Sequence, residues 1–395
     1  MSRVVGFWFP IVLFSAGAYA GPVVDTVDLS DYAVLPQCLT GPGVGLDPPC
    51  DVFDLDADTD LDLIDFAEFQ RAFLPPPGMQ YVPGGEFEMG DPFDEGEDDE
   101  LPVHTVYLSP YYIDKYEVTN GRYAAALNWA FAAGQVFVHE TDHDVRGTLN
   151  NIPYCDTTAR SEYSRITWDG SAFGVAEGKE NHPITRVTWQ GAAAYCNWRS
   201  AMEGRQQCYD LSTFICDFTA PGYRLPKEAE WEKASAWDAV ELRHFRFGEN
   251  SDGCGRNCLA GGRGNFFNSG QPFAYGGSSP GTTPVGFYNG ELHAKEDFDW
   301  PGGQLTYQTQ DAASYYGCYD MSGNVWEWCN DRYDPDYYDA SPSSNPTGPA
   351  DGTERVLRGG AWNEVPVDIR SARRIGRLPG FRFHSYGFRC AKGTP

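Results

Sequence analysis

A run of carboxylates near the N-terminus has the spacing of a metal-binding loop. Aspartates occupy loop positions 1, 3, 5, 7, 9 and 12, and they are Asp54, Asp56, Asp58, Asp60, Asp62 and Asp65. A calcium loop draws oxygen ligands from these positions. The apolar periodicity from Phe66 to Phe73 predicts an amphipathic helix that leaves the loop. The spacing therefore predicts a calcium site, and the alternative is a solvated acidic linker.

Together with that helix, residues 51–77 resemble a single dockerin-like calcium repeat of the EF-hand type, in which Asp, here Asp65, closes the loop. One position departs from the pattern, because Thr59 stands where Gly normally makes the sharp turn. The sequence shows no second loop that would pair with this one.

Two histidines are a weaker metal candidate. His139 and His143 lie four residues apart with Glu140 and Asp142 between them, a spacing that shares a metal when it occurs on a helix. The surrounding stretch is polar and lacks helical periodicity, so we expect a surface loop here.

The overall charge argues against two classes of partner. The chain of 395 residues has 56 acidic against 29 basic side chains, which gives a formal net charge of −27. Nucleic acids and anionic membrane surfaces both require a positive footprint, so we expect neither as a partner. The 44 Gly and 28 Pro residues, with an aromatic content of 15%, predict a fold rich in turns and irregular segments.

The N-terminus has the features of a signal peptide. Arg3 precedes an apolar run at 4–15, and Ala18 and Ala20 are small residues of the kind that a signal peptidase reads, so residues 1–20 are predicted to be removed. The apolar run is short for a transmembrane span, and an uncleaved anchor is the alternative. We therefore expect a secreted, extracytoplasmic protein without membrane attachment after cleavage, in which disulfides can form.

Beyond the signal peptide, the chain divides into three parts. Residues 21–50 form a Pro-rich linker, residues 51–77 hold the acidic repeat, and residues 80–393 form one large domain. Strands are predicted within 81–90, 103–109 and 111–118, and helices within 119–127, 190–200 and 226–234. Thr119 is the predicted N-cap of the first helix, and Pro226 is predicted in the first turn of the third. The class is therefore α+β, irregular, with few helices and short antiparallel strands.

Seven segments of the large domain, taken in order, resemble the formylglycine-generating enzyme family, the sulfatase-modifying factors. They are Val82–Gly90, Tyr116–Asn120, His182–Trp189, Gly222–Glu232, Tyr319–Trp328, Leu357–Trp362 and Gly387–Ala391. The resemblance implies a variant of the C-type-lectin-like fold. It also implies a chemistry, in which the family enzyme oxidises a sulfatase cysteine to formylglycine with molecular oxygen and a copper(I) ion held by two thiolates. Soft sulfur ligands suit copper(I).

The two cysteines of that chemistry are missing. When the motifs are laid on one another, the cysteine positions fall on Glu364 and Ile369, and the serine position of the family falls on Ala361. The sequence has no cysteine between Cys329 and Cys390. We therefore expect no catalytic residues of the family type and no bound copper, as in a pseudoenzyme.

The resemblance also implies a calcium site in the large domain. Its ligands fall on the carboxylates of Asp320 and Glu327 and on the backbone carbonyls of Gly323 and Val325. Ligation by oxygen alone suits calcium. The alternative is a turn with a structural role only.

Some of the 11 cysteines are assigned by the resemblance. It implies a disulfide between Cys196 and Cys390, which would stabilise the fold by roughly 4–5 kcal/mol in the chain-entropy model. Cys208 and Cys216 flank an insertion and are predicted to pair with each other. The other pairs considered are Cys254 with Cys258 and Cys318 with Cys329, and Cys155 is left over.

Six arginines near the C-terminus stand out in this acidic chain, and they are Arg370, Arg373, Arg374, Arg377, Arg382 and Arg389. Most are expected to form ion pairs with the acidic surplus. In the family that the chain resembles, this segment lines the substrate groove. Arg370 or Arg373 is therefore also a candidate for holding an anionic or peptide ligand.

Three functions are compatible with these features. The first is an exported, calcium-binding, non-catalytic module for a protein, peptide or glycan ligand. The second is a formylglycine-generating oxidase, which needs cysteines from elsewhere to replace those missing at Glu364 and Ile369. The third is a family enzyme that uses a different metal.

Overall fold

The computed structural model describes residues 75–253, 255–274 and 281–394. The predicted signal peptide, the linker and the acidic loop from Asp54 to Asp65 lie outside the described residues. The large domain is described almost throughout, and its architecture follows from two cores that cover a short central sheet.

The central sheet has four strands in the order β18-β17-β16-β19, and these are β18 (Arg374–Arg377), β17 (Arg355–Arg358), β16 (Trp326–Arg332) and β19 (Tyr386–Gly387). The strands β16, β17 and β18 pair antiparallel, whereas β19 pairs parallel with β16. Six of the seven residues of β16 are buried, because one core contains Trp328 and the other contains Cys329. A strand covered on both faces can be apolar along its whole length.

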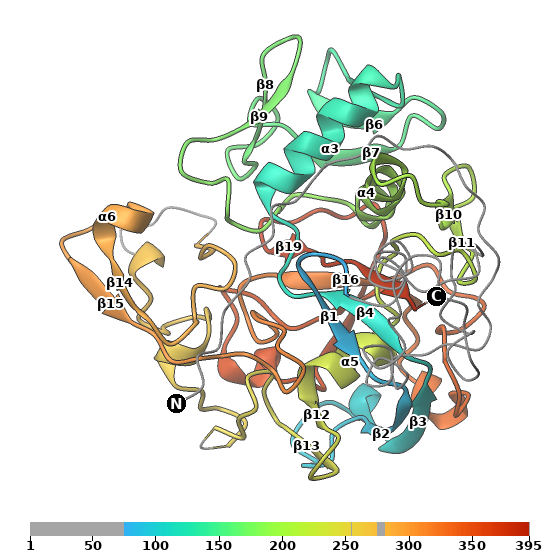
Figure 1. Ribbon diagram of the computed structural model, residues 1–395, viewed down its shortest axis with the longest axis vertical. Helices are drawn as coiled ribbons and strands as arrows, with labels where there is room; N and C mark the ends of the chain where they lie inside the picture. Colours follow the sequence, from blue (N-terminus) through green and yellow to red (C-terminus); the bar gives the residue numbers. More distant parts are fainter. Residues whose placement is uncertain (1–74, 254, 275–280, 395) are drawn as a thin grey trace, which may run out of the picture. The chain divides into compact units, whose positions relative to one another are not determined.

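A second sheet joins the two ends of the domain. The strands β1 (Met79–Val82) and β20 (Ala391–Gly393) flank β4 (Tyr111–Asp114) on either side. Next to it, β2 (Gly85–Met89) pairs antiparallel with β3 (His104–Leu108). Strands β2, β3 and β4 fall within the stretches where the sequence predicts strands, whereas β1 begins two residues before such a stretch and β20 lies outside all of them. Figure 1 shows β1 and β4 side by side near the middle of the molecule.

The helices of the described part are α3 (Asn120–Ala132), α4 (Trp189–Met202), α5 (Glu228–Ala236) and the single turn α6 (Lys295–Phe298). Thr119 caps α3 as predicted, since its hydroxyl accepts a hydrogen bond from the Arg122 N–H at 3.2 Å. The prediction for α5 was wrong by two residues, because Pro226 lies before the cap and its carbonyl accepts from Asn330 of β16 at 2.8 Å.

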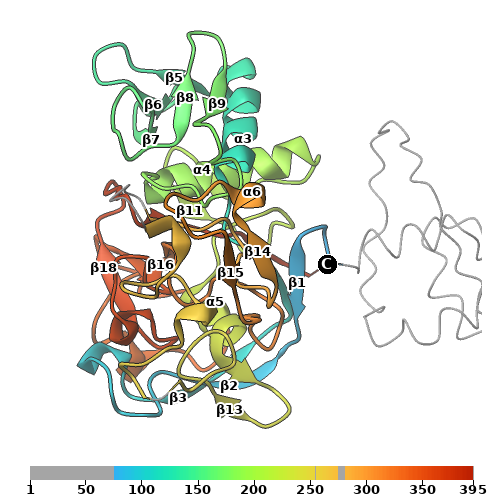
Figure 2. The ribbon, with the colours of Figure 1, turned by 90° about the vertical axis from the view of Figure 1, so that its left-hand side faces the viewer.

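Helices α3 and α4 pack against each other through aromatic rings, and Figure 2 shows them adjacent above the central sheet. The Tyr123 and Tyr195 rings stack at 5.6 Å, and Trp198 meets Tyr123 edge-on at 6.3 Å. Such contacts explain why an Ala-rich helix face still anchors a large core.

Short hairpins and turns fill the rest of the domain. They are β5 (Val136–Val138), β6 (Asp144–Gly147) and β7 (Pro153–Asp156); β8 (Ile166–Trp168) and β9 (Phe173–Val175); β10 (Tyr209–Asp210) and β11 (Ile215–Cys216); β12 (Trp237–Asp238) and β13 (Arg243–His244); and β14 (Leu292–Ala294) and β15 (Thr306–Gln308). His139 and His143 lie in the turn between β5 and β6, the loop that the sequence predicts.

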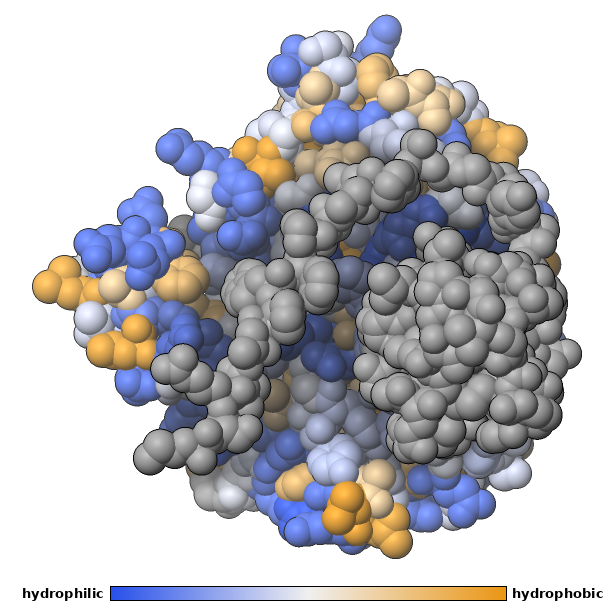
Figure 3. All heavy atoms as spheres, viewed as in Figure 1, coloured by the Kyte–Doolittle hydropathy of each residue, from blue (hydrophilic) through white to orange (hydrophobic). Residues whose placement is uncertain are grey.

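The surface is mainly polar. On the face shown in Figure 3, apolar side chains occur as small groups at the edges, over β12–β13 and over β14–β15. The exposed apolar residues of these hairpins are Val240, Leu242, Leu292 and Leu305. Within the described residues, no helix is both long and apolar enough to span a bilayer.

Candidate functional site

The loop that follows β17 carries Ala361, Glu364 and Ile369, the three positions at which the sequence predicts that the family's catalytic residues are missing. Gly359 and Gly360 begin it with φ angles of 88° and 71°. A Cβ on Gly360 would lie 2.6 Å from the Asp368 carbonyl and 2.4 Å from the side chain of Ile369, so only glycine fits this turn. The loop folds back on itself and ends in the 3₁₀ turn η7 (Pro366–Ile369).

Glu364 sits half-buried in this loop. Its Oε1 accepts a hydrogen bond from the Trp326 indole Nε1 at 3.3 Å, and its backbone carbonyl accepts from Phe267 N at 2.8 Å. Burial raises the pKa of Glu364, while the indole hydrogen bond lowers it, and the charge of Arg377 contributes in the same direction as the indole. The carboxyl is therefore partly withdrawn from water yet within reach of cationic groups.

The two other substituted positions are closed to solvent. Ile369 has no exposed surface and packs with Phe247, Leu259 and Phe266 in an apolar cluster. Ala361 is also fully buried. Neither side chain offers a metal ligand or a nucleophile.

Seven cysteines of the described residues are free thiols, and all of them come from segments outside this loop. Cys196 and Cys390 bring their Sγ atoms to 3.6 Å of each other as free thiols, both fully buried in the core that α3 and α4 share. The free thiols include both members of the predicted Cys208–Cys216 and Cys318–Cys329 pairs, and Cys155. Cys258 is disulfide-bonded, and its predicted partner Cys254 lies outside the described residues.

Burial disfavours the thiolate form at most of these sites. It raises the pKa of Cys196 well above its usual range, and it raises the pKa of Cys216 to about 12 and that of Cys318 to about 11. Thiolate is the form that binds copper and reacts.

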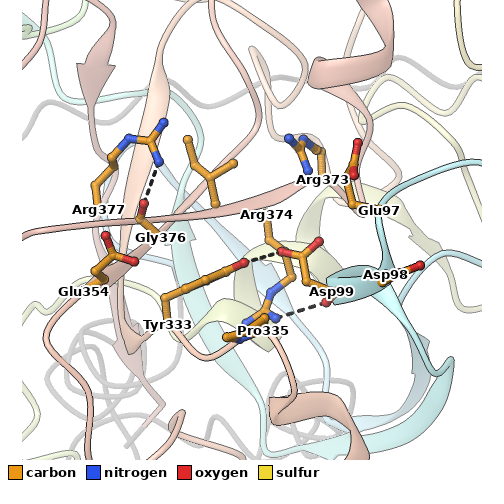
Figure 4. A pocket seen from close by; sticks show the side chains of 11 residues that line it. Glu97, Asp98, Asp99, Tyr333, Pro335, Glu354, Arg373, Arg374, Gly376 and Arg377 are labelled. Carbon is orange, nitrogen blue, oxygen red and sulfur yellow. Dashed lines mark hydrogen bonds between the residues drawn. The ribbon is translucent and has the colours of Figure 1, made fainter.

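A polar pocket of about 560 Å³ lies along β18 and is lined by none of the residues from Gly359 to Ile369 (Figure 4). Its basic side comes from β18 and the preceding residue, with Arg373, Arg374 and Arg377. Its acidic side comes from Glu97 and the 3₁₀ turn η3 (Asp98–Glu100). Tyr333 lies between them and donates its hydroxyl hydrogen to Asp99 Oδ2 at 2.6 Å. Such a pocket can hold a ligand that carries charges of both signs.

The motif order and this geometry agree with comparisons against known proteins. Residues 65–394 match the model of the sulfatase-modifying factor enzyme 1-like domain. The chain belongs to this family.

Its relatives in the family differ in length. The chain is 32% identical over 332 residues to the formylglycine-generating enzyme of Streptomyces coelicolor, a match that covers 80% of this chain and 88% of that protein. It is 32% identical over 318 residues to the serine/threonine-protein kinase pkn1 of Chlamydia caviae, covering 80% of this chain and only 38% of that protein. The solved structure of CarF, 20% identical with a TM-score of 0.50, covers 81% of this chain and 99% of its own, and shows the fold alone.

Arg370 and Arg373, the two arginines predicted to hold a ligand, differ in how accessible they are to that ligand. Arg370 is buried, and its guanidinium forms two hydrogen bonds with Glu100, at 2.7 and 2.8 Å, with Asp91 3.3 Å away. It is therefore already neutralised and closed to a ligand. Arg373 is partly exposed on the pocket wall, with Asp368 at 3.4 Å and Glu100 at 3.8 Å, so an anionic ligand there would compete with these two acids.

Most of the remaining arginines of the C-terminal segment are also paired. Arg374 forms two hydrogen bonds with Glu228, Arg382 forms two with Asp144, and Arg389 forms two with Glu327. Arg377 is exposed and donates to the Tyr386 hydroxyl at 3.1 Å.

In the loop from Asp320 to Glu327, which the family resemblance predicts to bind calcium, only some of the predicted ligands are free to bind a cation. Both carboxylate oxygens of Glu327 accept from Arg389 at 2.6 Å, and Oε2 also accepts from the Trp231 indole at 2.9 Å, so this side chain is not free to bind a metal. Asp320 accepts a hydrogen bond from Gly286 N through Oδ2 alone, at 2.6 Å. No three carboxylate, imidazole or thiolate groups of the described residues come together as a metal site.

Two buried acids near this loop were not found from the sequence. Glu117 accepts from Asn324 Nδ2 at 2.6 Å, and burial, with Asp320 and Glu327 adding to it, raises its pKa well above the usual range. Glu249 is buried with its Oε1 unpaired, and burial raises its pKa to about 8. Neither lies in a metal-like spacing. Glu117 falls within the family segment Tyr116–Asn120, but nothing in that segment marks it as a buried acid, and no sequence signal marks Glu249.

Proposed function

We propose that this chain is an exported, calcium-stabilised, non-catalytic member of the sulfatase-modifying factor family that binds a peptide or glycan ligand in the pocket lined by Arg373 and Arg377. The observation that supports this most directly is the side-chain chemistry at the two thiolate positions. One is the half-buried carboxyl of Glu364, and the other is Ile369, which has no exposed surface.

Copper(I) binding is disfavoured by both substitutions. A carboxylate is a hard ligand that suits calcium or magnesium, whereas copper(I) requires soft sulfur. Isoleucine supplies no ligand at all, and its packing against Phe247 and Phe266 fills the space that a second ligand would need.

Binding is favoured by the mixed charges of this pocket. The partly exposed Arg373 lies beside Glu97, and the exposed Arg377 lies on the same side as Glu354. An extended peptide or a charged glycan that carries both signs of charge can pair with these groups. The pocket volume of about 560 Å³ is in the range of ordinary ligand sites.

The alternative is a formylglycine-generating oxidase, which the 32% identity to the Streptomyces enzyme favours. In the described part of the chain, the thiol pair nearest to copper-bridging distance is Cys196 with Cys390, at 3.6 Å. Both are buried in the core, and burial keeps Cys196 protonated, so substrate would have to reach a closed site.

An aldehyde assay tests the proposal. The purified chain is loaded with copper(I) and incubated under oxygen with a Cys-x-Pro-x-Arg peptide, and aldehyde is captured with a hydrazide probe. We expect no aldehyde above the copper-only control. Aldehyde formed in proportion to enzyme would establish the oxidase instead.

A binding assay separates a ligand module from an inert fold. Labelled peptide and glycan arrays are probed with the chain and with the R373Q and R377Q variants. We expect array signals that both variants weaken. The exposed Glu86 on β2 offers a matched control, so E86Q should leave the signals unchanged. Signals that are absent, or that all three variants alter equally, would contradict a groove at this site.

A further inference from the structure

Three arginines form a row across the central sheet. Arg332 at the end of β16 lies opposite Arg355 of β17, and Arg355 lies opposite Arg377 of β18. Directly opposed residues of an antiparallel pair have their side chains on the same face of the sheet. Like charges in such positions repel each other and destabilise the sheet.

Asp331 offsets part of this repulsion, because its charge raises the pKa of Arg355, which burial lowers. On the same two strands, Arg358 pairs with Glu232, and Arg374 pairs with Glu228. In contrast, none of the ion pairs seen within residues 75–253, 255–274 and 281–394 includes Arg332, Arg355 or Arg377. In a chain of net charge −27, three unpaired neighbouring arginines are unexpected.

Arg355 is held in place by its surroundings. Its guanidinium lies 3.7 Å from the centre of the Trp189 ring, and one of its Nη atoms donates to the Asn330 carbonyl. Burial, together with the charge of Arg332, lowers the pKa of Arg355 to about 10. A guanidinium stacked and fixed in this way loses little freedom when it binds an anion.

Asp331 forms no ion pair with the row in the described part of the chain, because its carboxylate is bound by the backbone of α5. Asp331 precedes Arg332 but is buried, and its Oδ2 accepts a hydrogen bond from Glu228 N at 2.9 Å, at the start of α5. Burial raises the pKa of Asp331 to about 7, so its negative charge is weakened near neutral pH.

Arg332 and Arg355 share a pocket of about 170 Å³. Its polar lining also includes Thr213, Asn330 and Thr347, and Phe214 forms part of its apolar wall. No Asp or Glu is among the described residues that line it. Two cations, neutral hydrogen-bonding groups and a small volume suit a compact anion.

We propose that this pocket binds a small divalent oxyanion, a sulfate or phosphate group, between Arg332 and Arg355. Arginine holds such groups through paired hydrogen bonds, and two guanidinium groups balance the two negative charges. The volume fits the oxyanion itself rather than a larger molecule, so an ester would leave its organic part outside. The site lies on different residues from the pocket lined by Arg373 and Arg377 and does not depend on the function proposed there.

Calorimetry and thermal unfolding test this site at constant ionic strength. Sodium sulfate and sodium phosphate are compared with sodium chloride on the full mature chain. We expect saturable heat and a rise in Tm with sulfate or phosphate. Because charge-assisted hydrogen bonds are lost, R332Q should weaken binding about tenfold or more. Without anion, R332Q should unfold at a higher temperature than the parent, because it relieves the repulsion.

The controls separate this site from general anion effects. R243Q removes one positive charge from β13, where Arg243 already has Glu241 and Asp252 as partners, and it should leave binding unchanged. R355K keeps the charge but loses the paired hydrogen bonds, so it should bind more weakly than the parent. Methyl sulfate and methyl phosphate distinguish an ester headgroup from the free ion, since only an open pocket accepts the methyl group. Absence of saturable binding by the parent, or equal binding by the parent and R332Q, would overturn the proposal.

Discussion

Glu364 Oε1 accepts a hydrogen bond from the Trp326 indole nitrogen at 3.3 Å. The resemblance to the formylglycine-generating enzymes predicts a copper thiolate at this position. On that prediction, a carboxyl that an aromatic donor holds in place stands where the family has a soft metal ligand. The turn at Gly359 and Gly360 fixes the loop that carries it.

Restoring the thiolates tests whether the loop is the family's copper loop. The triple variant A361S/E364C/I369C should bind one equivalent of copper(I), because it supplies two thiolates and the serine at the aligned positions. Competition against a chromophoric copper(I) chelator measures this. We also expect a loss of stability of about 1–2 kcal/mol, because Cys fills less of the Ile369 site in the core.

The single variants E364C and I369C are the controls for this experiment. Each supplies one thiolate and should compete for copper far more weakly than the triple variant. If the triple variant does not compete better than the singles, the two positions do not face a common site and the motif alignment is wrong at this loop.

The Cys196 and Cys390 thiols should form a disulfide when the chain is oxidised. Their sulfurs are 3.6 Å apart, and closing a loop of this length stabilises the fold by roughly 4–5 kcal/mol in the chain-entropy model. Peptide mapping of protein exported into an oxidising compartment should find this bridge, and dithiothreitol should lower the Tm. Dithiothreitol should lower the Tm of the C196S/C390S variant less than that of the parent, because the disulfide at Cys258 remains reducible in both. Free thiols at both positions in exported protein would contradict the assignment.

Local signals were sufficient to predict several elements of the fold. Thr119 precedes an Ala-rich amphipathic stretch and does cap α3. The alternating residues at 103–109 do form β3. The start of α5 was placed too early because Pro226 favours a first helical turn, whereas its carbonyl is bound to Asn330, a residue far along the chain. Long-range hydrogen bonds of this kind leave no local pattern.

The same limit applied to the charged residues. Arg370 was a ligand candidate, but it pairs with Glu100, which is 270 residues away in sequence. Glu327 was a calcium candidate, but Arg389, 62 residues later, occupies both its oxygens. The unpaired row of Arg332, Arg355 and Arg377 depends on strand register, which single-sequence patterns do not specify for such short strands.

Glu249 should make stability depend on pH. The pKa of Glu249 is raised by burial to about 8 in the fold, whereas an unfolded Glu titrates near about 4.3. Between these values the folded state keeps a proton that the unfolded state has lost, so the free energy of unfolding falls as pH rises from about 4.3 to 8. E249Q removes this titration. It should exceed the parent in stability by an amount that grows with pH, on the order of 2–4 kcal/mol at pH 8.

Urea unfolding at pH 5, 6.5 and 8 measures this difference. The exposed Glu86 provides the control, and E86Q should track the parent at all three values. A gap between E249Q and the parent that stays constant or narrows with rising pH would show that Glu249 ionises normally in the fold.

Calcium removal should destabilise the chain, and two variants locate the effect within the large domain. Chelation is expected to lower the Tm of the parent, with metal analysis after dialysis giving the stoichiometry. Because the Glu327 oxygens are occupied by Arg389 and Trp231, any calcium at this loop depends on Asp320 and main-chain carbonyls. D320A should therefore lose bound calcium, whereas D320N keeps one ligand oxygen and should retain more.

E327Q should lower the free energy of unfolding by about 3–5 kcal/mol with or without calcium, because it leaves the buried Arg389 unpaired. If chelation leaves the Tm unchanged and no calcium is found, the metal has no part in the proposed function. If E327Q lowers the free energy of unfolding only when calcium is present, Glu327 is a calcium ligand after all.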